Sequence, residues 1–499
     1  MPEKLELRWP GKDDGFALVR DERTGDPKKI PHDEVQPRLL IEQARYGDAD
    51  AKNMLIRGEN LFALKSLLAA GFAGKIKLIY IDPPFNTGQT FEHYDDGLEN
   101  SLWLTMMRDR VALLRDLLAE DGSIYVHLDW RSGHYGRCIL DDLFGATNFR
   151  NEVIWQKIRV VKAQSRGFGN VHDMIFTYSA GENPIFYQQY RPHDENYEAK
   201  FDKVDPETGQ RYQLVSMIQK GQGPPRMFGK RTLSPPPGMH WIWTQERIDE
   251  AMLNGEIEFT SGGKGTPRKR QYYDPDKGQP VHDLWTDIFP VNSQAKESVN
   301  FDTQKPEALL DRVIQASSNE GDWVLDCFAG SGTTGAVAQK LGRKWIMVEL
   351  GEQAQTFALP RLNKLVAGEG QKVLSGNGGF RYYVLGEPLV ITDNKLGVPV
   401  INPKYDNGLL VQAVLLQEGF TQTGDSELHG RNGSAFAHVT EEYVTPTYLK
   451  RLTSRLSEGE ALVIYCLKYA PGLQSPKNVK VKKIPRDLKV KYATVHGKE

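Results

Sequence analysis

The sequence has little cysteine, no excess of charge of one sign and no long apolar run. Its three cysteines, Cys138, Cys327 and Cys466, are far apart and lack the spacing of a metal site, so no metal centre is expected. So few cysteines suit a reducing compartment, and the first residues do not resemble a signal peptide, so we expect a cytoplasmic protein. No apolar stretch is long enough to cross a bilayer. The net charge of -2 means that any surface for nucleic acid must be a local patch.

The chain also lacks a G-x-x-x-x-G-K-[ST] phosphate loop and internal repeats. What it has is an alternation of buried-strand and amphipathic-helix patterns, which predicts a mainly parallel, doubly wound α/β sheet. The alternation is interrupted by a stretch rich in turns and aromatics, in which one or two further sheet strands are expected. The predicted parts are a loose lead-in (1–45), a first α/β half (46–154), an insert (155–300), a second α/β half (301–370) and a C-terminal α+β accessory domain (371–499).

The first candidate site follows the apolar run 77–81, which reads as a buried strand. Asp82, Pro83, Pro84 and Phe85 come directly after it, and ligands of open α/β sheets bind outside the carboxyl ends of strands. A carboxylate and a rigid proline carbonyl are both acceptors, which suits an amino group with two donors. Phe85 offers a face on which a planar base can stack. Taken alone, the segment would rather be interpreted as a surface turn with Asp at its first position.

The second candidate site is a glycine-rich turn at 329–335, between the strand 323–328 and a helix from 336. The run Gly330 to Gly335 fits G-x-G-x-x-G, and Glu349 at the end of the next strand could accept the hydroxyls of a ribose. Several nucleotide cofactors use this turn, so a nicotinamide-dependent oxidoreductase is one alternative.

Basic residues occur in clusters within the insert, interleaved with Trp and Tyr. This combination suits phosphate contacts together with base or sugar packing, although solvated surface charge is almost as good an explanation. The candidate nucleic-acid contacts are Lys157, Arg159, Arg166, Arg268, Lys269 and Arg270.

Taken together, the chain resembles the amino-methylating DNA methyltransferases. The motifs that carry the resemblance are Asp82-Pro83-Pro84-Phe85, the segment 328–334 and the segment Thr303-Gln304-Lys305-Pro306-Glu307. They are similar to those of the β-class adenine-N6 group, which includes modification subunits of type III restriction systems. In that group the catalytic half precedes the target-recognition segment and the cofactor half, a permuted order of a Rossmann-like fold.

The resemblance implies S-adenosylmethionine as the cofactor. It implies that Asp82 and Pro83 hold the target amine, that Phe85 stacks on the base and that Pro84 completes the catalytic motif. Lys305 would meet the carboxylate of the cofactor, Asp326 and Asp82 its methionine end, and Glu349 its ribose. The remaining implied cofactor contacts are Glu59, Asn60, Phe328, Gly330, Ser331, Gly332 and Thr333, and Glu59 departs from the Asp more frequent in the family.

The implied activity is transfer of a methyl group to N6 of a flipped adenine in double-stranded DNA, within a restriction-modification or related defence system. Cytosine-N4 methylation stays open because the residue at position 82 does not sort the two groups perfectly. A catalytically silent DNA-binding subunit is the non-enzymatic alternative. We also expect a homodimer, and motor and nuclease functions on a separate restriction subunit.

Overall fold

A computed structural model describes residues 6–21, 26–85, 90–91, 94–95, 100–160, 167–193, 195–275, 278–292, 294–368, 378–393 and 395–488. The chain forms two compact units, residues 1–187 with 282–499, and residues 188–281. Each unit is described by itself.

The first unit is built on a ten-stranded sheet. In spatial order its strands are β21 (Leu284–Trp285), β9 (Phe149–Gln156), β10 (His172–Ser179), β8 (Leu118–Leu128), β5 (Ile76–Ile81), β22 (Trp323–Asp326), β23 (Lys344–Glu349), β4 (Met54–Arg57), β24 (Gly379–Leu385) and β3 (Leu40–Gly47). The six strands from β8 to β24 are parallel, whereas β10 and β3 run antiparallel to their neighbours. The sheet is therefore mixed with a parallel centre, and the prediction of an α/β fold is confirmed.

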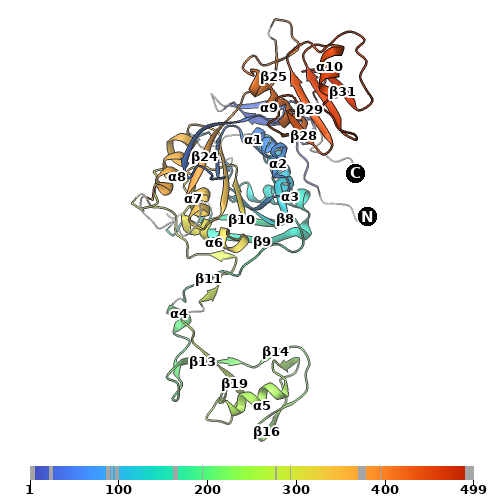
Figure 1. Cartoon of the computed structure of the whole chain (residues 1–499). Coiled ribbons are helices and arrows are strands. Elements are labelled where there is room, and N and C mark those ends of the chain that lie inside the picture. Colours follow the sequence, from blue (N-terminus) through green and yellow to red (C-terminus); the bar gives the residue numbers. More distant parts are fainter. Residues whose placement is uncertain are drawn as a thin grey trace. The chain divides into compact units, whose positions relative to one another are not determined.

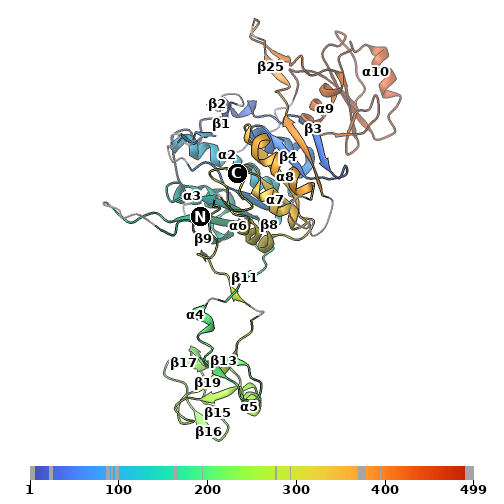
Figure 2. The same cartoon turned by 90° about the vertical axis from the view of Figure 1, so that its left-hand side faces the viewer.

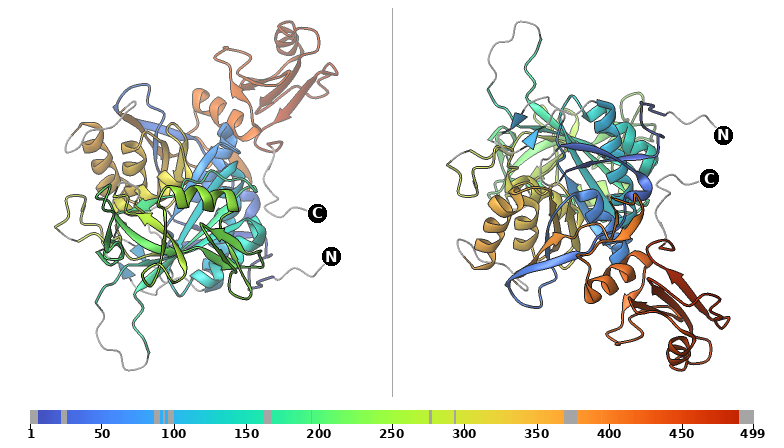
Figure 3. Two further views of the ribbon diagram at one scale, coloured as in Figure 1. Left: turned by 90° about the horizontal axis from the view of Figure 1, so that it is seen from below. Right: turned by 90° about the horizontal axis from the view of Figure 1, so that it is seen from above.

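Helices cover both faces of this sheet (Figures 1 and 3). One face carries α1 (Asn60–Leu67), α2 (Asn100–Leu117) and α3 (Gly133–Phe144), and the other carries α6 (Glu307–Ser317), α7 (Thr333–Lys340) and α8 (Leu359–Val366). A parallel strand must be reached by a crossover, and helices are the usual crossover, so both faces are buried. This explains why the central strands read as continuous apolar runs.

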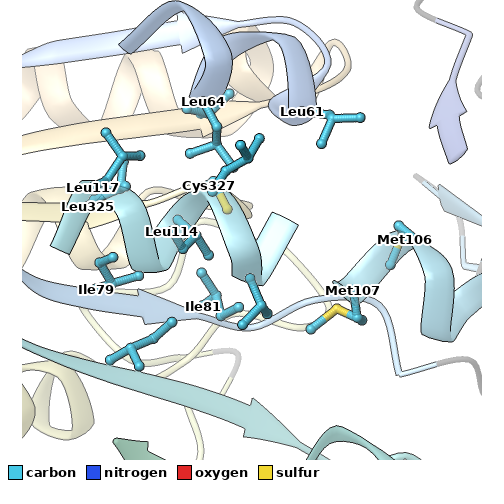
Figure 4. Packing of buried hydrophobic residues seen from close by; sticks show 14 of the residues in the cluster. Leu61, Leu64, Ile79, Ile81, Met106, Met107, Leu114, Leu117, Leu325 and Cys327 are labelled. Carbon is cyan, nitrogen blue, oxygen red and sulfur yellow. The ribbon is translucent and has the colours of Figure 1, made fainter. Parts of the chain in front are cut away.

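The core between α1, α2 and the sheet fixes the strands that carry the two candidate sites. Leu114 and Leu117 of α2 pack with Ile79 and Ile81 of β5 and with Leu325 of β22, as Figure 4 shows. All five side chains are fully buried, which contributes roughly 1.5–3 kcal/mol each. The buried positions 104, 107, 111 and 114 along α2 have the spacing of one helix face.

The expectation of a loose lead-in over residues 1–45 is wrong. A hairpin of β1 (Phe16–Arg20) and β2 (Pro27–Pro31) forms there, and β3 pairs with β24 in the central sheet. Ala17, Leu18 and Val19 are buried in the main core. The short apolar run 17–19 was not recognised as a strand because charged residues and prolines flank it. The pairing of β3 with β24 could not be predicted either, because the two strands are far apart in the sequence.

Two other predicted boundaries also differ from the structure. The strands β9 and β10 belong to the central sheet, so the insert shrinks at its start, and the prediction had allowed one or two such strands. The strand β24 lies after residue 371 and yet belongs to the same sheet, so the C-terminal part begins later than expected.

The C-terminal residues form a five-stranded sheet of their own. Its order is β27 (Thr421–Gln422), β28 (Gly430–Asn432), β29 (Ala435–Thr440), β30 (Ala461–Cys466) and β31 (Val479–Lys483), with α9 (Asn407–Glu418) and α10 (Pro446–Thr453) packed on it. Within the described ranges, no helix is long and apolar enough to cross a membrane.

The second unit, residues 188–281, has its own small core. A four-stranded sheet has the order β12 (Lys203–Val204), β13 (Arg211–Ser216), β19 (Pro267–Tyr272) and β18 (Ile257–Phe259), and α5 (Gln245–Leu253) accompanies it (Figure 2). Its buried residues include Met217, Phe228, Trp241 and Ile248.

Candidate active site

The two candidate segments come together at the centre of the sheet. The strands β5 and β22 are adjacent and parallel, with Leu78 opposite Val324 and Ile79 opposite Leu325. Their carboxyl ends therefore bring Asp82 and Asp326 to the same edge. A cavity of about 930 Å³ opens there, and residues of both segments line it. Positions more than two hundred residues apart in the chain thus share one site.

Asp82 is held by a lysine of the third motif. Its Oδ2 forms an ion pair with Nζ of Lys305, and both side chains are largely buried, at 17% and 12% exposed. Its Oδ1 is buried without a hydrogen-bond partner among the described atoms. This oxygen is therefore a buried acceptor without a partner, in a residue that lines the cavity.

Pro84 and Phe85 are held in place by contacts with neighbouring side chains. Trp103 of α2 donates its indole N–H to the Pro84 carbonyl at 2.6 Å. The Phe85 ring lies 5.9 Å from the His127 ring, and the ammonium groups of Lys305 and Lys157 lie 5.5 and 5.9 Å from its centroid. Packing with a ring and two cations sets the orientation of the one aromatic face in this motif.

The backbone of the glycine-rich turn binds the carboxylate of Glu349. Glu349 accepts the Gly330 N–H at 2.6 Å and the Leu350 N–H at 3.1 Å. Gly330 and Gly332 have φ of 50° and 78°, and a Cβ on Gly332 would lie 3.2 Å from Ala358, so this turn requires glycine. Burial raises the pKa of Glu349, and the hydrogen bonds from the backbone act against that rise.

Asp326 is a buried carboxylate at the cavity, 3% exposed. Burial raises its pKa to about 7, although the Thr334 hydroxyl and the Phe328 N–H donate to it at 2.6 and 2.9 Å. The nearby hydroxyls of Ser331 and Thr333 lie 3.2 Å apart, and Thr333 donates to the Lys305 carbonyl. The second and third motifs are thereby joined.

Glu59 and Asn60 belong to a buried cluster that the sequence did not reveal in full. Glu59 caps α1 through the Leu61 N–H, and its other oxygen pairs with the Arg110 guanidinium. Asn60 accepts from Arg110 at 2.5 Å and donates to the Cys327 carbonyl at 2.8 Å. Arg110 lines the cavity and is 1% exposed. The signal was an arginine on the apolar face of a predicted helix.

The β1–β2 hairpin also reaches the cavity, through Arg20, Asp21, Asp26 and Pro27. Sequence reasoning gave these residues no role, because they stand among charges without a motif.

The predicted nucleic-acid contacts that the structure describes belong to both units. Lys157 pairs with Asp173 at 2.6 Å, and Arg159 donates to the Thr286 carbonyl and stacks 4.0 Å from the Phe289 centroid. Arg166 lies outside the described residues. In the second unit, Arg268, Lys269 and Arg270 lie on β19, and Arg270 pairs with Asp205 at 3.0 Å.

The polar groups that line the cavity suit a positively charged nucleoside. Asp82, Asp326 and Glu349 are acidic, whereas hydroxyls and backbone N–H groups line the turn between them. Opposite charge and acceptors for ribose hydroxyls are what S-adenosylmethionine requires. No group of three or more metal-ligating side chains occurs among the residues that the structure describes.

Comparison with known proteins places this geometry in a family. The N6_N4_Mtase model, a DNA methylase family, matches residues 76–359. Type II methyltransferase M.EcaI of Enterobacter cloacae is 32% identical, over 69% of this chain and 75% of its own length. A probable type III restriction-modification enzyme HindVI Mod subunit of Haemophilus influenzae is 31% identical over 67% of this chain. DNA adenine methyltransferase YhdJ of Escherichia coli is 26% identical, over 65% of this chain and 87% of its own length.

These matches confirm the predicted resemblance to amino-methylating DNA methyltransferases and to Mod subunits, although the chain spans only 54% of the HindVI Mod subunit. They overrule the nicotinamide-dependent alternative. Because the family model covers more than half of the sequence, the chain belongs to the N6_N4_Mtase family of DNA methylases.

Proposed function

We propose that the chain transfers a methyl group from S-adenosylmethionine to N6 of adenine in DNA. The observation that carries the proposal is the placement of Asp82, with its unpaired buried oxygen, in the same cavity as Gly330 and Glu349. The first group suits an amine, and the other two suit a nucleoside, so both reactants fit one site.

The cofactor side would be formed by the second half of the sheet. Glu349 would accept the ribose hydroxyls with lone pairs not used by the backbone N–H groups, and Asp326 would face the methionine end. Phe328, Gly330, Ser331, Gly332 and Thr333 would surround it along the turn. S-adenosylmethionine supplies an electrophilic methyl group on a positively charged sulfur.

The base side would be formed by the Asp82 segment. The lone pair of an exocyclic amine is delocalised into the ring and is a weak nucleophile. Acceptance of its two N–H groups by the Asp82 carboxylate and the Pro83 carbonyl favours a pyramidal nitrogen, and Phe85 holds the ring by stacking. The rate acceleration would come from the positioning of the two reactants and from the preorganised electrostatics of the site. The target base must leave the duplex to reach this cavity, at a cost of a few kcal/mol.

Adenine is favoured over cytosine by Asp82, because cytosine-N4 enzymes usually have Ser at this place. The name of YhdJ as an adenine methyltransferase agrees with this assignment. Cytosine-N4 methylation is the second candidate, since the matched family covers both reactions.

Residues 188–281 would form the target-recognition unit of a permuted methyltransferase, since they fold separately between the two halves. DNA as substrate favours a cytoplasmic location. The names of the M.EcaI and HindVI relatives favour a restriction-modification system, with double-stranded DNA as the partner. A homodimer and a separate restriction subunit remain part of the proposal by analogy.

The test uses DNA amplified in vitro from a bacterial genome, which carries no methylated bases but contains every recognition site. The protein is incubated with this DNA and methyl-labelled S-adenosylmethionine, and the digested nucleosides are separated. Label in N6-methyldeoxyadenosine supports the proposal, whereas label in N4-methyldeoxycytidine, or none in DNA, overturns it. Asp82→Ala should abolish the label, and Asp121→Ala is its matched control, because Asp121 also pairs with a lysine, Lys77, but near the opposite ends of β5 and β8.

A further inference from the structure

Three buried side chains on neighbouring strands form a hydrogen-bonded chain that ends at the cavity. Tyr80 Oη lies 2.8 Å from His127 Nδ1, and His127 Nε2 lies 3.2 Å from Asp173 Oδ2. The three residues belong to β5, β8 and β10, and none is more than 1% exposed. Tyr80 stands two residues before Asp82, and both line the cavity.

The partners determine where the hydrogens lie. Burial alone would raise the pKa of Asp173, but its contacts with His127 and Lys157 lower it to about 2, so Asp173 is a carboxylate that can only accept. His127 Nε2 therefore carries a proton, and in the neutral ring Nδ1 is an acceptor. In this tautomer Tyr80 donates its single O–H to His127 Nδ1. Its phenol oxygen can then only accept a further hydrogen bond.

We propose that Tyr80 is a further catalytic residue, which takes the surplus proton of the target amine, and that His127 and Asp173 position its hydroxyl as an acceptor. This inference rests on the proposed function. An amine that has gained a methyl group holds one proton too many and a positive charge. Asp82 is a weaker candidate for this proton because it is already paired with Lys305.

The transfer is balanced within the chain of groups. An N–H bond of the amine breaks as an O–H bond forms at Tyr80, and the original Tyr80 O–H bond breaks as His127 Nδ1 gains the proton. The imidazolium that results faces the Asp173 carboxylate, which stabilises it. Asp173 also lies 2.6 Å from Lys157, whose side chain is 33% exposed, so the chain of groups extends from the cavity towards solvent.

The charged groups around Tyr80 agree with an acceptor of positive charge. Asp82 and Asp326 face it from the cavity, and Asp173 lies behind His127. Burial first, and these three carboxylates second, raise the pKa of Tyr80, so the phenol is neutral before the transfer. The aromatic rings of Phe85 and Trp155 pack on His127 at 5.9 and 5.6 Å and exclude water from it.

The first experiment compares Tyr80→Phe with Tyr125→Phe on amplified genomic DNA. Tyr125 is the ladder partner of Tyr80 on β8, and its buried hydroxyl bonds Ser317 at 2.7 Å away from the cavity. Tyr80→Phe should lower kcat roughly 10²-fold, the usual contribution of a positioned proton acceptor, and leave KM for S-adenosylmethionine unchanged. Tyr125→Phe should keep full activity at a similar loss of stability.

The second experiment tests the relay and has a readout in the free protein. His127→Gln and Tyr80→Phe should lose similar factors in kcat, and the double variant should lose no more than either, because the residues act as one unit. In ¹⁵N-histidine spectra, His127 should show a protonated Nε2 and a bare Nδ1, and Tyr80→Phe should shift the Nδ1 resonance.

Equal kcat for Tyr80→Phe and wild type, or additive losses in the double variant, overturns the inference while the proposed function stands. A protonated Nδ1 in the free protein overturns it as well. A wild-type protein that labels no base in DNA overturns both.

Discussion

The cavity and the second unit differ in how their charged side chains are arranged. At the cavity, seven acidic side chains, among them Asp82, Asp326 and Glu349, meet four basic ones, Arg20, Arg57, Arg110 and Lys305. In residues 188–281, three of the described basic side chains form ion pairs with acids of the same unit: Lys203 with Glu258, Arg247 with Glu256 and Arg270 with Asp205. A site that concentrates like charge is prepared for a ligand of opposite sign, whereas a unit that neutralises its charges is stabilised by them.

This contrast corrects how basic clusters are read from a sequence. The segment 268–270 looks like a continuous positive run, but successive residues of a strand point to opposite faces, so Lys269 points away from the face that Arg268 and Arg270 share. Arg270 is turned towards Asp205, and the Tyr272 hydroxyl together with the Glu207 N–H lowers the pKa of Asp205 to about 2. Part of the apparent nucleic-acid surface is therefore structural.

The largest effect is expected from Asp82→Ala, which removes the acceptor for the amine. Methylation should fall by about 10²–10³-fold, the range of losses found for single groups that stabilise a transition state. Cofactor affinity, measured by calorimetry, should change little. A loss of affinity as large as that of Lys305→Ala would contradict the separate roles assigned to these two residues.

A loss of folding stability is expected from Arg110→Met, because it leaves the buried Glu59 carboxylate without its partner. Breaking a buried pair in this way costs about 3–5 kcal/mol, which urea unfolding would measure. Arg115→Met on the same helix is the control, since its pair with Asp116 is exposed and should contribute less than about 1 kcal/mol. Equal losses in the two variants would remove the distinction between cavity and surface pairs.

The third prediction concerns pH. Because burial raises the pKa of Asp326 to about 7 in the folded state, the unfolded chain releases this proton at lower pH than the folded one. The contribution of Asp326 to stability is therefore present below the ordinary pKa of an aspartate and is lost as pH rises to about 7, by a few kcal/mol at most. Asp326→Asn should flatten this slope in melting scans. In wild type, cofactor affinity should rise over the same interval as the carboxylate ionises, and a flat profile would contradict its position beside a cation.

The smallest effect is expected in the second unit. Arg268→Ala and Lys269→Ala should each weaken DNA binding modestly and reduce the slope of log affinity against log salt by about one. Arg270→Ala should instead lower stability, with a smaller change in the salt slope. If all three variants change the slope alike, the pairing of Arg270 with Asp205 does not persist on DNA.

Most of the cavity could be predicted because its chemistry is local in the sequence. Asp82 and Asp326 both follow buried strands, and parallel strands deliver their ends to one edge. Arg110 and the hairpin 16–31 could not be predicted in the same way. Arg110 acts through Glu59, fifty-one positions away, and the hairpin carries no motif, so only packing reveals its place.

The sequence by itself determined the motifs, the α/β pattern and the residue types at the site, because strand ends, glycine turns and apolar spacing are written in short segments. The tertiary structure alone decided which groups meet. The pairing of Lys305 with Asp82, the chain from Tyr80 to Asp173 and the neutralisation of Arg270 each join separate elements. Such contacts depend on sheet order and register, which long-range packing sets and no short segment encodes.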